Sequence, residues 1–431
     1  MVGAGHPGRP RLTVPEIADV AVVGAGAAGL ATAIFTRRLN PSRTVLLLDG
    51  AARPGAKILV SGGSRCNVTN AAVSERDFSG GKPTIIRRVL RAFTVPDTIA
   101  WFSQLGVPLH KEPHGKLFPN SNRSRDVLDA LLREASLAGV ELMAATRVVE
   151  ITRGPDGFRL GTSRGVLAAR TVVLATGGKS LPKTGSDGFG LELAERLGHT
   201  IVPTTPALVP LVAHEDESLH QRLTGVAMDV ELSVWVARRI ARTIAGSLLW
   251  THFGVSGPVV LDASRHWLRA LLEKQDVPGI TIRLLPGESF ERLEWNWSSL
   301  AQSRPRMSIQ TALAERMPAS VAGAVLGQAC IDPATVLAAL PRPDRRRLSH
   351  ALVELPLPLS GSRGYNYAEA TAGGVALDEI DPGTMASRRC AGLYLVGEML
   401  DVDGRIGGFN FQWAWSSARA AARALSGSIS S

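Results

Sequence analysis

The 431-residue sequence has few cysteines, few aromatic residues and no long hydrophobic run. Its three cysteines, Cys66, Cys330 and Cys390, form no C-x-x-C motif. This spacing excludes a disulfide framework and a cysteine-based zinc site, and it fits a reducing cytoplasm. The apolar stretch from Val20 to Phe35 contains three glycines and is shorter than the roughly 20 residues that a membrane span needs. We therefore expect a cytoplasmic protein with no membrane segment, and no His, Asp or Glu spacing predicts a metal site.

Charged residues make up 20% of the chain and apolar residues 45%, which is ordinary for a globular enzyme of two or three domains. The formal net charge is +10. The densest basic cluster, Arg342 to Arg347, contains no aromatic residue, so we expect a small-molecule partner rather than a nucleic acid. Residues 1–17 are expected to form a disordered tail. The sequence does not define an oligomeric state.

The strongest pattern lies near the N-terminus, where an apolar run meets a glycine-rich turn. Val20 to Val23 precedes a G-x-G-x-x-G motif, and a second apolar run, Val45 to Leu48, ends at Asp49. This order of strand, glycine turn, helix, second strand and acidic residue is typical of a dinucleotide-binding unit. In such a unit the pyrophosphate binds at the helix N-terminus. A carboxylate at the ribose favours FAD or NAD over NADP, whose 2′-phosphate it would repel. The expected contacts are Gly24, Ala25, Gly26, Ala28, Gly29, Asp49 and Gly50.

A second patterned segment lies near the C-terminus. The apolar run Leu393 to Val396 leads into glycines and acidic residues, and a helix is expected from Phe411 to Leu425. In flavoproteins with two dinucleotide-binding domains, such a strand, acidic turn and helix close the ribityl end of FAD, and the helix N-terminus faces the flavin pyrimidine. The expected contacts are Gly397, Glu398, Asp403, Gly407, Gly408, Phe409, Asn410 and Phe411.

The composition changes at about residue 205 and becomes glycine-rich again after residue 355. We therefore expect a discontinuous FAD-binding domain of residues 18–204 and 356–431, and an inserted domain of residues 205–355. The insertion is expected to be mostly β, with a strand at Leu208 to Val212 and a small helical segment near Arg345 to Glu354. The predicted fold class is α/β, with a Rossmann-like FAD-binding domain of the two-dinucleotide-binding-domain (ββα) type that carries this insertion.

A glycine-rich loop, Pro54 to Asn70, follows the ribose acid and reads PGAKILVSGGSRCNVTN. Here the sequence resembles the BaiN-like flavoproteins, also called the aminoacetone oxidase family of FAD-dependent enzymes, whose hallmark is a PGxKxLxSGGGRCNxTN loop. The resemblance covers nearly the whole chain and continues through Ala175 to Gly185, Thr251 to Pro258 and Gly397 to Trp415. Ser64 departs from it, since it replaces the usual third glycine.

This resemblance implies an FAD-dependent oxidoreductase and extends the set of expected cofactor contacts. The loop residues would run along the flavin, Val148 would touch adenine through its backbone, and a later glycine segment would close over the adenosine half. The added contacts are Lys57, Ser61, Gly62, Gly63, Arg65, Cys66, Asn67, Val148, Ala175, Thr176 and Gly177.

Three residues are candidate catalytic groups. Arg65 is a candidate to stabilise reduced flavin or a substrate anion, with pairing to a carboxylate as the equal alternative. Asn67 is expected to fix hydrogen bonds of the loop or the flavin. His252 is a candidate proton donor from the insertion, although a structural role is preferred. Cys66 has no nearby partner cysteine, so we prefer a packing role to a redox role.

The expected function is transfer of electron pairs between a non-covalently held FAD and a small organic substrate. The sequence has no second G-x-G-x-x-G motif, so NAD(P)H would visit the flavin only transiently in a reductase, and O2 would take up the electrons in an oxidase. The resemblance permits amine oxidation of the aminoacetone type or reduction of an activated C=C bond. Two alternatives stay open: a flavin-bearing factor that modifies tRNA or another nucleic acid, and a non-catalytic FAD-binding regulator.

Overall fold

The computed structural model describes residues 17–214, 218–274 and 278–427. The expected N-terminal tail lies outside the described residues, apart from Ile17. Within the described ranges, every helix is too short or too polar to cross a membrane.

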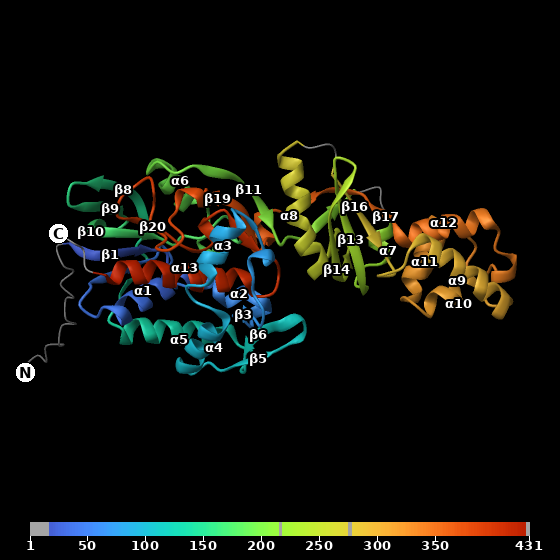
Figure 1. Ribbon diagram of the computed structural model, residues 1–431, viewed down its shortest axis with the longest axis horizontal. Helices are drawn as coiled ribbons and strands as arrows, with labels where there is room; N and C mark the ends of the chain where they lie inside the picture. Colours follow the sequence, from blue (N-terminus) through green and yellow to red (C-terminus); the bar gives the residue numbers. More distant parts are fainter. Residues whose placement is uncertain (1–16, 215–217, 275–277, 428–431) are drawn as a thin grey trace, which may run out of the picture.

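The larger part of the molecule is built on a mixed sheet, shown at the left of Figure 1. Its parallel strands lie in the order β7-β2-β1-β10-β20, and a hairpin, β8 and β9, extends β10 in the antiparallel direction. The apolar sequence of β2 and the apolar ends of β1 and β10 reflect burial on both faces, as expected for parallel strands covered by helices. The strands are β1 (Ala18–Val23), β2 (Val45–Leu48), β7 (Glu141–Met143), β8 (Val148–Gly154), β9 (Gly157–Thr162), β10 (Gly165–Leu174) and β20 (Leu393–Leu395).

Two helices from opposite ends of the chain lie side by side against this sheet, α1 (Ala27–Leu39) and α13 (Phe409–Ser426) (Figure 1). Two buried indoles fix α13. Trp413 Nε1 donates to the carbonyl of Gly397 at 3.1 Å, and Trp415 Nε1 donates to the carbonyl of Val68 at 3.0 Å. The C-terminal helix is therefore anchored to the segment that precedes it and to the loop after α2, as well as to α1.

The remaining elements of this part are short. The glycine-rich loop after β2 contains a helix, α2, whose backbone leaves the helical region at Ser61 to Gly63. The helical region of residues 83–104 is divided into α3 and α4, because Thr94 and Asp97 form a capping box that starts a new helix. These elements are α2 (Ala56–Ser64), β3 (Thr69–Asn70), β4 (Phe78–Gly80), α3 (Pro83–Leu90), α4 (Val95–Gln104), β5 (Leu109–Lys111), β6 (Lys116–Pro119), α5 (Ser124–Leu137), α6 (Phe189–Arg196), β11 (Ile201–Ala207), β19 (Ala370–Val375) and β21 (Val402–Gly404).

A second, antiparallel sheet and a group of helices form what we call the insert, from β12 to residues 363–367, which directly follow β18 (right half of Figure 1). Strand order is β17-β16-β13-β14-β15-β12-β18, and α8 packs against β13 and β14. Helices α9 to α12 lie at the end farthest from the first sheet (Figure 1). The elements are β12 (Leu211–Ala213), α7 (Ser218–Arg222), β13 (Ala227–Val236), β14 (Arg239–Thr251), β15 (Gly254–Ser256), α8 (Pro258–Leu272), β16 (Gly279–Arg283), α9 (Phe290–Ser303), α10 (Ile309–Ala314), α11 (Ala319–Gln328), α12 (Arg342–Val353), β17 (Leu355–Leu357) and β18 (Leu359–Ser362).

Each sheet has its own hydrophobic core. One buried cluster joins residues 18–194 with 375–425, and another contains residues 211–355. The division of the chain at residues 205 and 355 stays a prediction. The strand expected at Leu208 to Val212 is interrupted, because Leu208 has a left-handed backbone (φ 52°) where the chain leaves β11 and enters β12.

A buried carboxylate, Glu379, ties three segments of the larger part together. It lies in the turn η6 (Leu377–Glu379) and accepts hydrogen bonds from His199 Nδ1 at 3.0 Å, from the Thr200 N–H at 3.0 Å and from Arg389 at 2.8 Å. Burial works against ionisation, but the bonds from Thr200, Arg389 and His199 outweigh it and lower the pKa of Glu379 to about 2. Burial also lowers the pKa of His199, so at neutral pH the imidazole is neutral beside a carboxylate.

We expect the substitution Glu379→Gln to lower the free energy of unfolding at pH 7 by about 2 kcal/mol, because it removes a charged acceptor from buried donors. The carboxylate stabilises the fold fully above its ordinary pKa of 4.5, and this contribution disappears as the pH falls through the lowered value. Urea unfolding of both proteins between about pH 7 and pH 3 measures the difference. The control Asp378→Asn removes an exposed carboxylate paired with exposed Lys82 and should change stability by less than about 0.5 kcal/mol. A difference for Glu379→Gln that stays constant down to pH 3 would contradict the ionic role.

Candidate functional site

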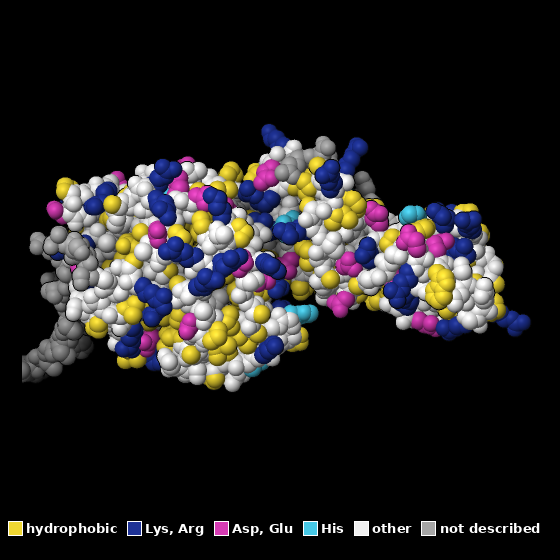
Figure 2. Space-filling view, viewed as in Figure 1, with side chains coloured by type: hydrophobic (Ala, Val, Ile, Leu, Met, Phe, Trp, Pro, Cys, Tyr) yellow, Lys and Arg dark blue, Asp and Glu magenta, His cyan; other side chains and the backbone are white. Residues whose placement is uncertain are grey.

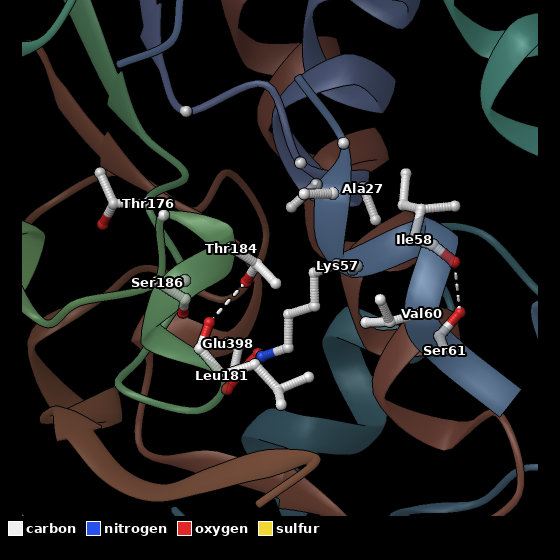
Figure 3. A pocket seen from close by; sticks show the side chains of 18 of the residues that line it. Ala27, Lys57, Ile58, Val60, Ser61, Thr176, Leu181, Thr184, Ser186 and Glu398 are labelled. Atoms are coloured by element: carbon white, nitrogen blue, oxygen red, sulfur yellow. Dashed lines mark hydrogen bonds and ion pairs between the residues drawn. The ribbon is translucent and has the colours of Figure 1, made fainter. Parts of the chain in front are cut away.

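A cavity of about 980 Å³ opens at the carboxyl ends of β1 and β10, which is where open α/β sheets bind ligands. The glycine turn after β1, helix α2, the loop after β10 and the start of α13 form its walls. In Figure 3, Lys57, Ile58, Val60 and Ser61 project from α2 on one side, and the segment with Thr176, Thr184 and Ser186 lies opposite.

The glycine turn has almost no room for side chains on its sheet side. A Cβ at Gly24, whose φ is +102°, would lie 2.6 Å from the carbonyl oxygen of Ala175, and a Cβ at Gly29 would lie 1.8 Å from the carbonyl oxygen of Gly24. A Cβ at Gly26 would meet no protein atom within 4 Å, and Gly26 lines the cavity. No side chain caps α1 at this residue. The positive end of the helix dipole is therefore presented to the cavity, as in sites that bind phosphate.

Asp49, at the end of β2, also lines the cavity. Its Oδ2 accepts a hydrogen bond from the Ala25 N–H at 2.7 Å, and its Oδ1 accepts one from the Ala51 N–H at 2.8 Å. These two bonds fix the orientation of the carboxylate against the turn. Because a carboxylate offers about four lone-pair positions, Asp49 retains capacity to accept from a ribose hydroxyl.

An ion pair spans the cavity between Lys57 of α2 and Glu398, which follows β20 (Figure 3). Ser180 accepts a hydrogen bond from Lys57 and donates to Glu398 Oε1 at 2.7 Å. The N–H of Thr371 donates to the same oxygen at 3.1 Å. Glu398 thus joins four separate segments at the cavity wall.

The segment after α2 places Arg65 and Asn67 in the cavity wall and Cys66 behind it. Arg65 forms an ion pair with Glu112 at 2.7 Å and lies 4.0 Å above the ring of Phe118. The carboxylate partner considered for Arg65 is therefore present, while the guanidinium still reaches the cavity. Asn67 Oδ1 accepts from the Leu117 N–H at 3.2 Å. Burial raises the pKa of the Cys66 thiol to about 12, which supports packing over redox chemistry.

A carboxylic acid that sequence reasoning did not single out, Glu369, lines the cavity together with Lys116 and Arg405. Its backbone N–H donates to the carbonyl of Leu208 at 3.1 Å. Glu369 is exposed to the open cavity, but the protein atoms around it desolvate the carboxylate and raise its pKa, and the charges of Lys116 and Lys57 act in the opposite direction. The one available sequence signal was its place directly before the glycine-containing strand β19.

Asp403 does not line the cavity, because α8 of the insert takes up its carboxylate. Arg265 Nε lies 2.6 Å from Asp403 Oδ2. Burial raises the pKa of Asp403 to about 6, against the effect of Arg265. One turn earlier on α8, Asp262 Oδ1 accepts from the Ile406 N–H at 2.7 Å. This helix therefore contacts both ends of the segment that leads into α13.

The structure brings most of the expected cofactor contacts together. Six of the expected contacts do not line the cavity: Ala25, Gly29, Cys66, Gly397, Asp403 and Phe409. His252 is also outside it, exposed in the turn between β14 and β15 with its ring against Phe253. The expected contacts that line the cavity are Gly24, Gly26, Ala28, Asp49, Gly50, Lys57, Ser61, Gly62, Gly63, Arg65, Asn67, Val148, Ala175, Thr176, Gly177, Glu398, Gly407, Gly408, Asn410 and Phe411.

The walls fit a phosphate-bearing dinucleotide. The backbone N–H groups at the start of α1 have no side-chain cap, and the space beside Gly26 is free of protein atoms within 4 Å of a Cβ position. Such N–H groups at a helix start are suited to phosphate oxygens. Across the described ranges there is no group of three or more His, Cys, Asp or Glu side chains placed to hold a metal ion.

Comparison with known proteins also identifies a Rossmann-type nucleotide-binding chain. The family described as HI0933-like protein Rossmann domain matches residues 18–424. A ribosomal RNA dihydrouridine synthase of Escherichia coli (strain K12) is 34% identical over 411 residues, which cover 94% of this chain and 98% of that protein. A 3-dehydro-bile acid delta(4,6)-reductase of Clostridium scindens is 31% identical over 405 residues, with coverage of 94% and 98%.

A solved structure of E. coli quinol fumarate reductase FrdA has a TM-score of 0.51 at 15% identity, and the match covers 95% of this chain and 70% of that chain. This likeness concerns the fold alone. Family and fold together confirm the expected Rossmann-like α/β architecture with an antiparallel insertion, and they confirm the resemblance to BaiN-like flavoproteins. The chain belongs to the HI0933-like family and is a flavin-dependent oxidoreductase.

Proposed function

We propose that the protein holds FAD non-covalently in this cavity and reduces a C=C bond conjugated to a carbonyl group, with uridine in ribosomal RNA as the substrate. The observation that carries the proposal is that one cavity joins the glycine turn, the α2 segment and the start of α13 to a single acid with a raised pKa, Glu369. The two relatives, matched over nearly their whole length, are both named for saturation of such a bond.

In this proposal each wall of the cavity contacts a different part of FAD. The start of α1 holds the pyrophosphate, and Asp49 holds the adenosine ribose. The α2 segment from Ser61 to Asn67 and the start of α13 hold the isoalloxazine ring. When bound, FAD supplies the hydride equivalent for the reduction.

Saturation of a conjugated C=C bond also requires a proton at the second carbon, and we assign its delivery to Glu369. The raised pKa of Glu369 favours its protonated form, which can donate a proton. Lys116 and Lys57 stabilise the carboxylate that remains after donation. A cysteine donor is not favoured, because none of the three cysteines lines the cavity.

The sequence alone predicts a small-molecule partner, because the basic cluster Arg342 to Arg347 contains no aromatic residue. The charge of the cavity lining instead supports an RNA substrate, and Lys and Arg side chains are also spread over the face of the molecule shown in Figure 2. Seven basic and four acidic side chains line the cavity, and the formal charge of the chain is +10. A basic entrance attracts a polyanion and raises its rate of association. The basic residues are Arg53, Lys57, Arg65, Lys116, Arg147, Lys183 and Arg405, and the acidic residues are Asp49, Asp187, Glu369 and Glu398.

The second candidate is a reductase of small conjugated ketones, favoured by the full-length match to the bile acid reductase. Both candidates need a reductant, and we propose that NADH or NADPH binds transiently at the flavin.

We expect the purified protein to be yellow and, with NADPH or NADH, to form dihydrouridine in unmodified ribosomal RNA. Digestion to nucleosides and mass spectrometry would detect the gain of two hydrogens on uridine. Parallel reactions contain a 3-keto-delta(4,6) bile acid or aminoacetone in place of RNA. Reduction of the bile acid without any dihydrouridine would favour the second candidate, and oxidation of aminoacetone with O2 uptake would overturn the reductase assignment.

We expect Gly26→Ala to abolish FAD binding while leaving the apoprotein folded. The backbone of Gly26 (φ −82°) suits alanine, and the added Cβ meets no protein atom, so it projects into the space assigned to the pyrophosphate. FAD titration followed by flavin fluorescence, with thermal unfolding of the apoprotein, measures both effects. The control Gly327→Ala, on α11 and likewise without a contact within 4 Å, should bind FAD normally. Unchanged FAD affinity in Gly26→Ala would contradict the pyrophosphate assignment.

We expect Glu369→Gln to slow the reduction of substrate by about 100-fold or more and to leave reduction of the flavin by NAD(P)H unchanged. Stopped-flow measurement of the two half-reactions separates these steps. In the wild-type protein the substrate half-reaction should slow as the pH rises through the raised pKa of Glu369, because the group must be protonated to donate. This decrease of the rate with rising pH should be absent in Glu369→Gln. If the variant keeps the wild-type rate and pH profile, another group delivers the proton.

A further inference from the structure

An arginine of the insert is held between two aromatic rings. The guanidinium carbon of Arg363 lies 3.5 Å from the ring centre of Tyr367 and 4.6 Å from that of Phe253. Phe253 precedes β15, and Arg363 directly follows β18, so the two strands that flank β12 supply both residues. Stacking of this kind orders a long side chain and leaves the N–H groups at the edge of the guanidinium plane available to an anion.

This cluster, Phe253, Arg363 and Tyr367, is adjacent to the cavity. The turn η5 (Tyr365–Tyr367) joins them, since the Tyr365 carbonyl accepts from the N–H of Leu181, which lines the cavity. Two residues after Tyr367 the chain reaches Glu369 in the cavity wall. The cluster therefore lies beside the part of the cavity wall that contains Leu181 and Glu369.

Arg363 has the features of a ligand-binding arginine. Across the described ranges it forms no ion pair with an Asp or Glu side chain, whereas Arg65, the stacked arginine inside the cavity wall, is neutralised by Glu112. Tyr367 is 49% exposed, so an aromatic side chain beside the guanidinium is accessible to solvent. An unpaired, ordered guanidinium beside an open aromatic ring suits a nucleotide, whose phosphate and base it can bind together.

We propose that Arg363, held by Phe253 and Tyr367, binds a backbone phosphate of RNA next to the uridine that enters the cavity, while the exposed ring of Tyr367 stacks on a neighbouring base. This inference rests on the proposed function, since it assumes a polynucleotide substrate. It assigns the insert a specific role, because the cluster comes from its strands and the turn that follows them. The phosphate contact positions the strand, and the cavity selects the base.

The test compares Arg363→Gln, Arg363→Lys and a control, Arg346→Gln. Arg346 is also exposed, without an ion pair in the described part of the chain, and stacked on a ring, Phe290, at 5.1 Å, but it lies on α12 at the distal end of the insert. Each protein is loaded with FAD, and its flavin content and melting temperature are checked against the wild type. Binding of a fluorescein-labelled, uridine-rich single-stranded RNA is then measured by anisotropy over a range of KCl concentrations.

We expect Arg363→Gln to weaken RNA binding about tenfold and to lower the slope of log affinity against log salt by about 0.7, the value for one lost contact to a single strand. Arg363→Lys should restore the salt slope but not the full affinity, because lysine keeps the charge and loses the planar stack. Arg346→Gln should match the wild type. With ribosomal RNA as substrate, Arg363→Gln should raise KM with little change in kcat, and Tyr367→Ala but not Tyr367→Phe should do the same.

The outcomes separate this inference from the proposed function. If the wild-type protein neither binds the RNA nor forms dihydrouridine, the proposed function fails, and this inference fails with it. If the wild type does both and Arg363→Gln is indistinguishable from it, the proposed function stands and the phosphate contact is overturned. If Arg363→Gln instead raises the NADPH concentration needed for flavin reduction and leaves RNA affinity unchanged, the bound phosphate belongs to the reductant, and the assignment to RNA is wrong.

Discussion

The close approach of helix α1 to the ends of β1 and β10 is the constraint on which the rest of the site depends. A single methyl group at Gly29 or Gly24 would overlap backbone atoms of the turn or of Ala175. Because these contacts are backbone to backbone, no rotamer change can relieve them. They bring the first turn of α1 to the end of the sheet, and this position directs its uncapped N–H groups and its dipole into the cavity.

The second constraint is that the C-terminal segment packs at the same end of the sheet as the start of α1. Trp413 and Trp415 bury their rings and still find backbone acceptors, Gly397 and Val68, in two segments far apart in the sequence. Glu398 then connects that segment to Lys57, Ser180 and Thr371 across the cavity wall. The cavity therefore exists only in the folded chain as a whole, since no continuous stretch of sequence supplies more than part of its lining.

Much of this site could be predicted from the sequence, because its motifs depend on local backbone geometry. The glycine turn, Asp49 and the glycines before α13 lie in patterns whose spacing is set by backbone geometry, so their positions could be read without knowledge of partners. The role of Glu369 and the contact of Phe253 with Arg363 could not be read in this way. The raised pKa of Glu369 depends on walls built from distant segments, and Phe253 and Arg363 meet only because β12 pairs with both of their strands. The motif around Asp403 predicted a contact with the cofactor, but the carboxylate of Asp403 instead pairs with Arg265, a residue distant in the sequence.

Ser61 to Gly63 were expected within a loop. The structure places them at the end of α2, where the glycines let the chain turn out of the helix.

Helix α8 of the insert contacts the segment before α13 through two side chains one turn apart. Asp262 accepts a hydrogen bond from the N–H of Ile406, and Arg265 forms an ion pair with Asp403. Removal of the arginine alone would leave a buried, unpaired acid beside the cofactor segment. Domain shuffling among relatives is constrained accordingly. A foreign domain grafted between β11 and β19 would lose both contacts unless its own docking helix carried an acid and an arginine at this i, i+3 spacing.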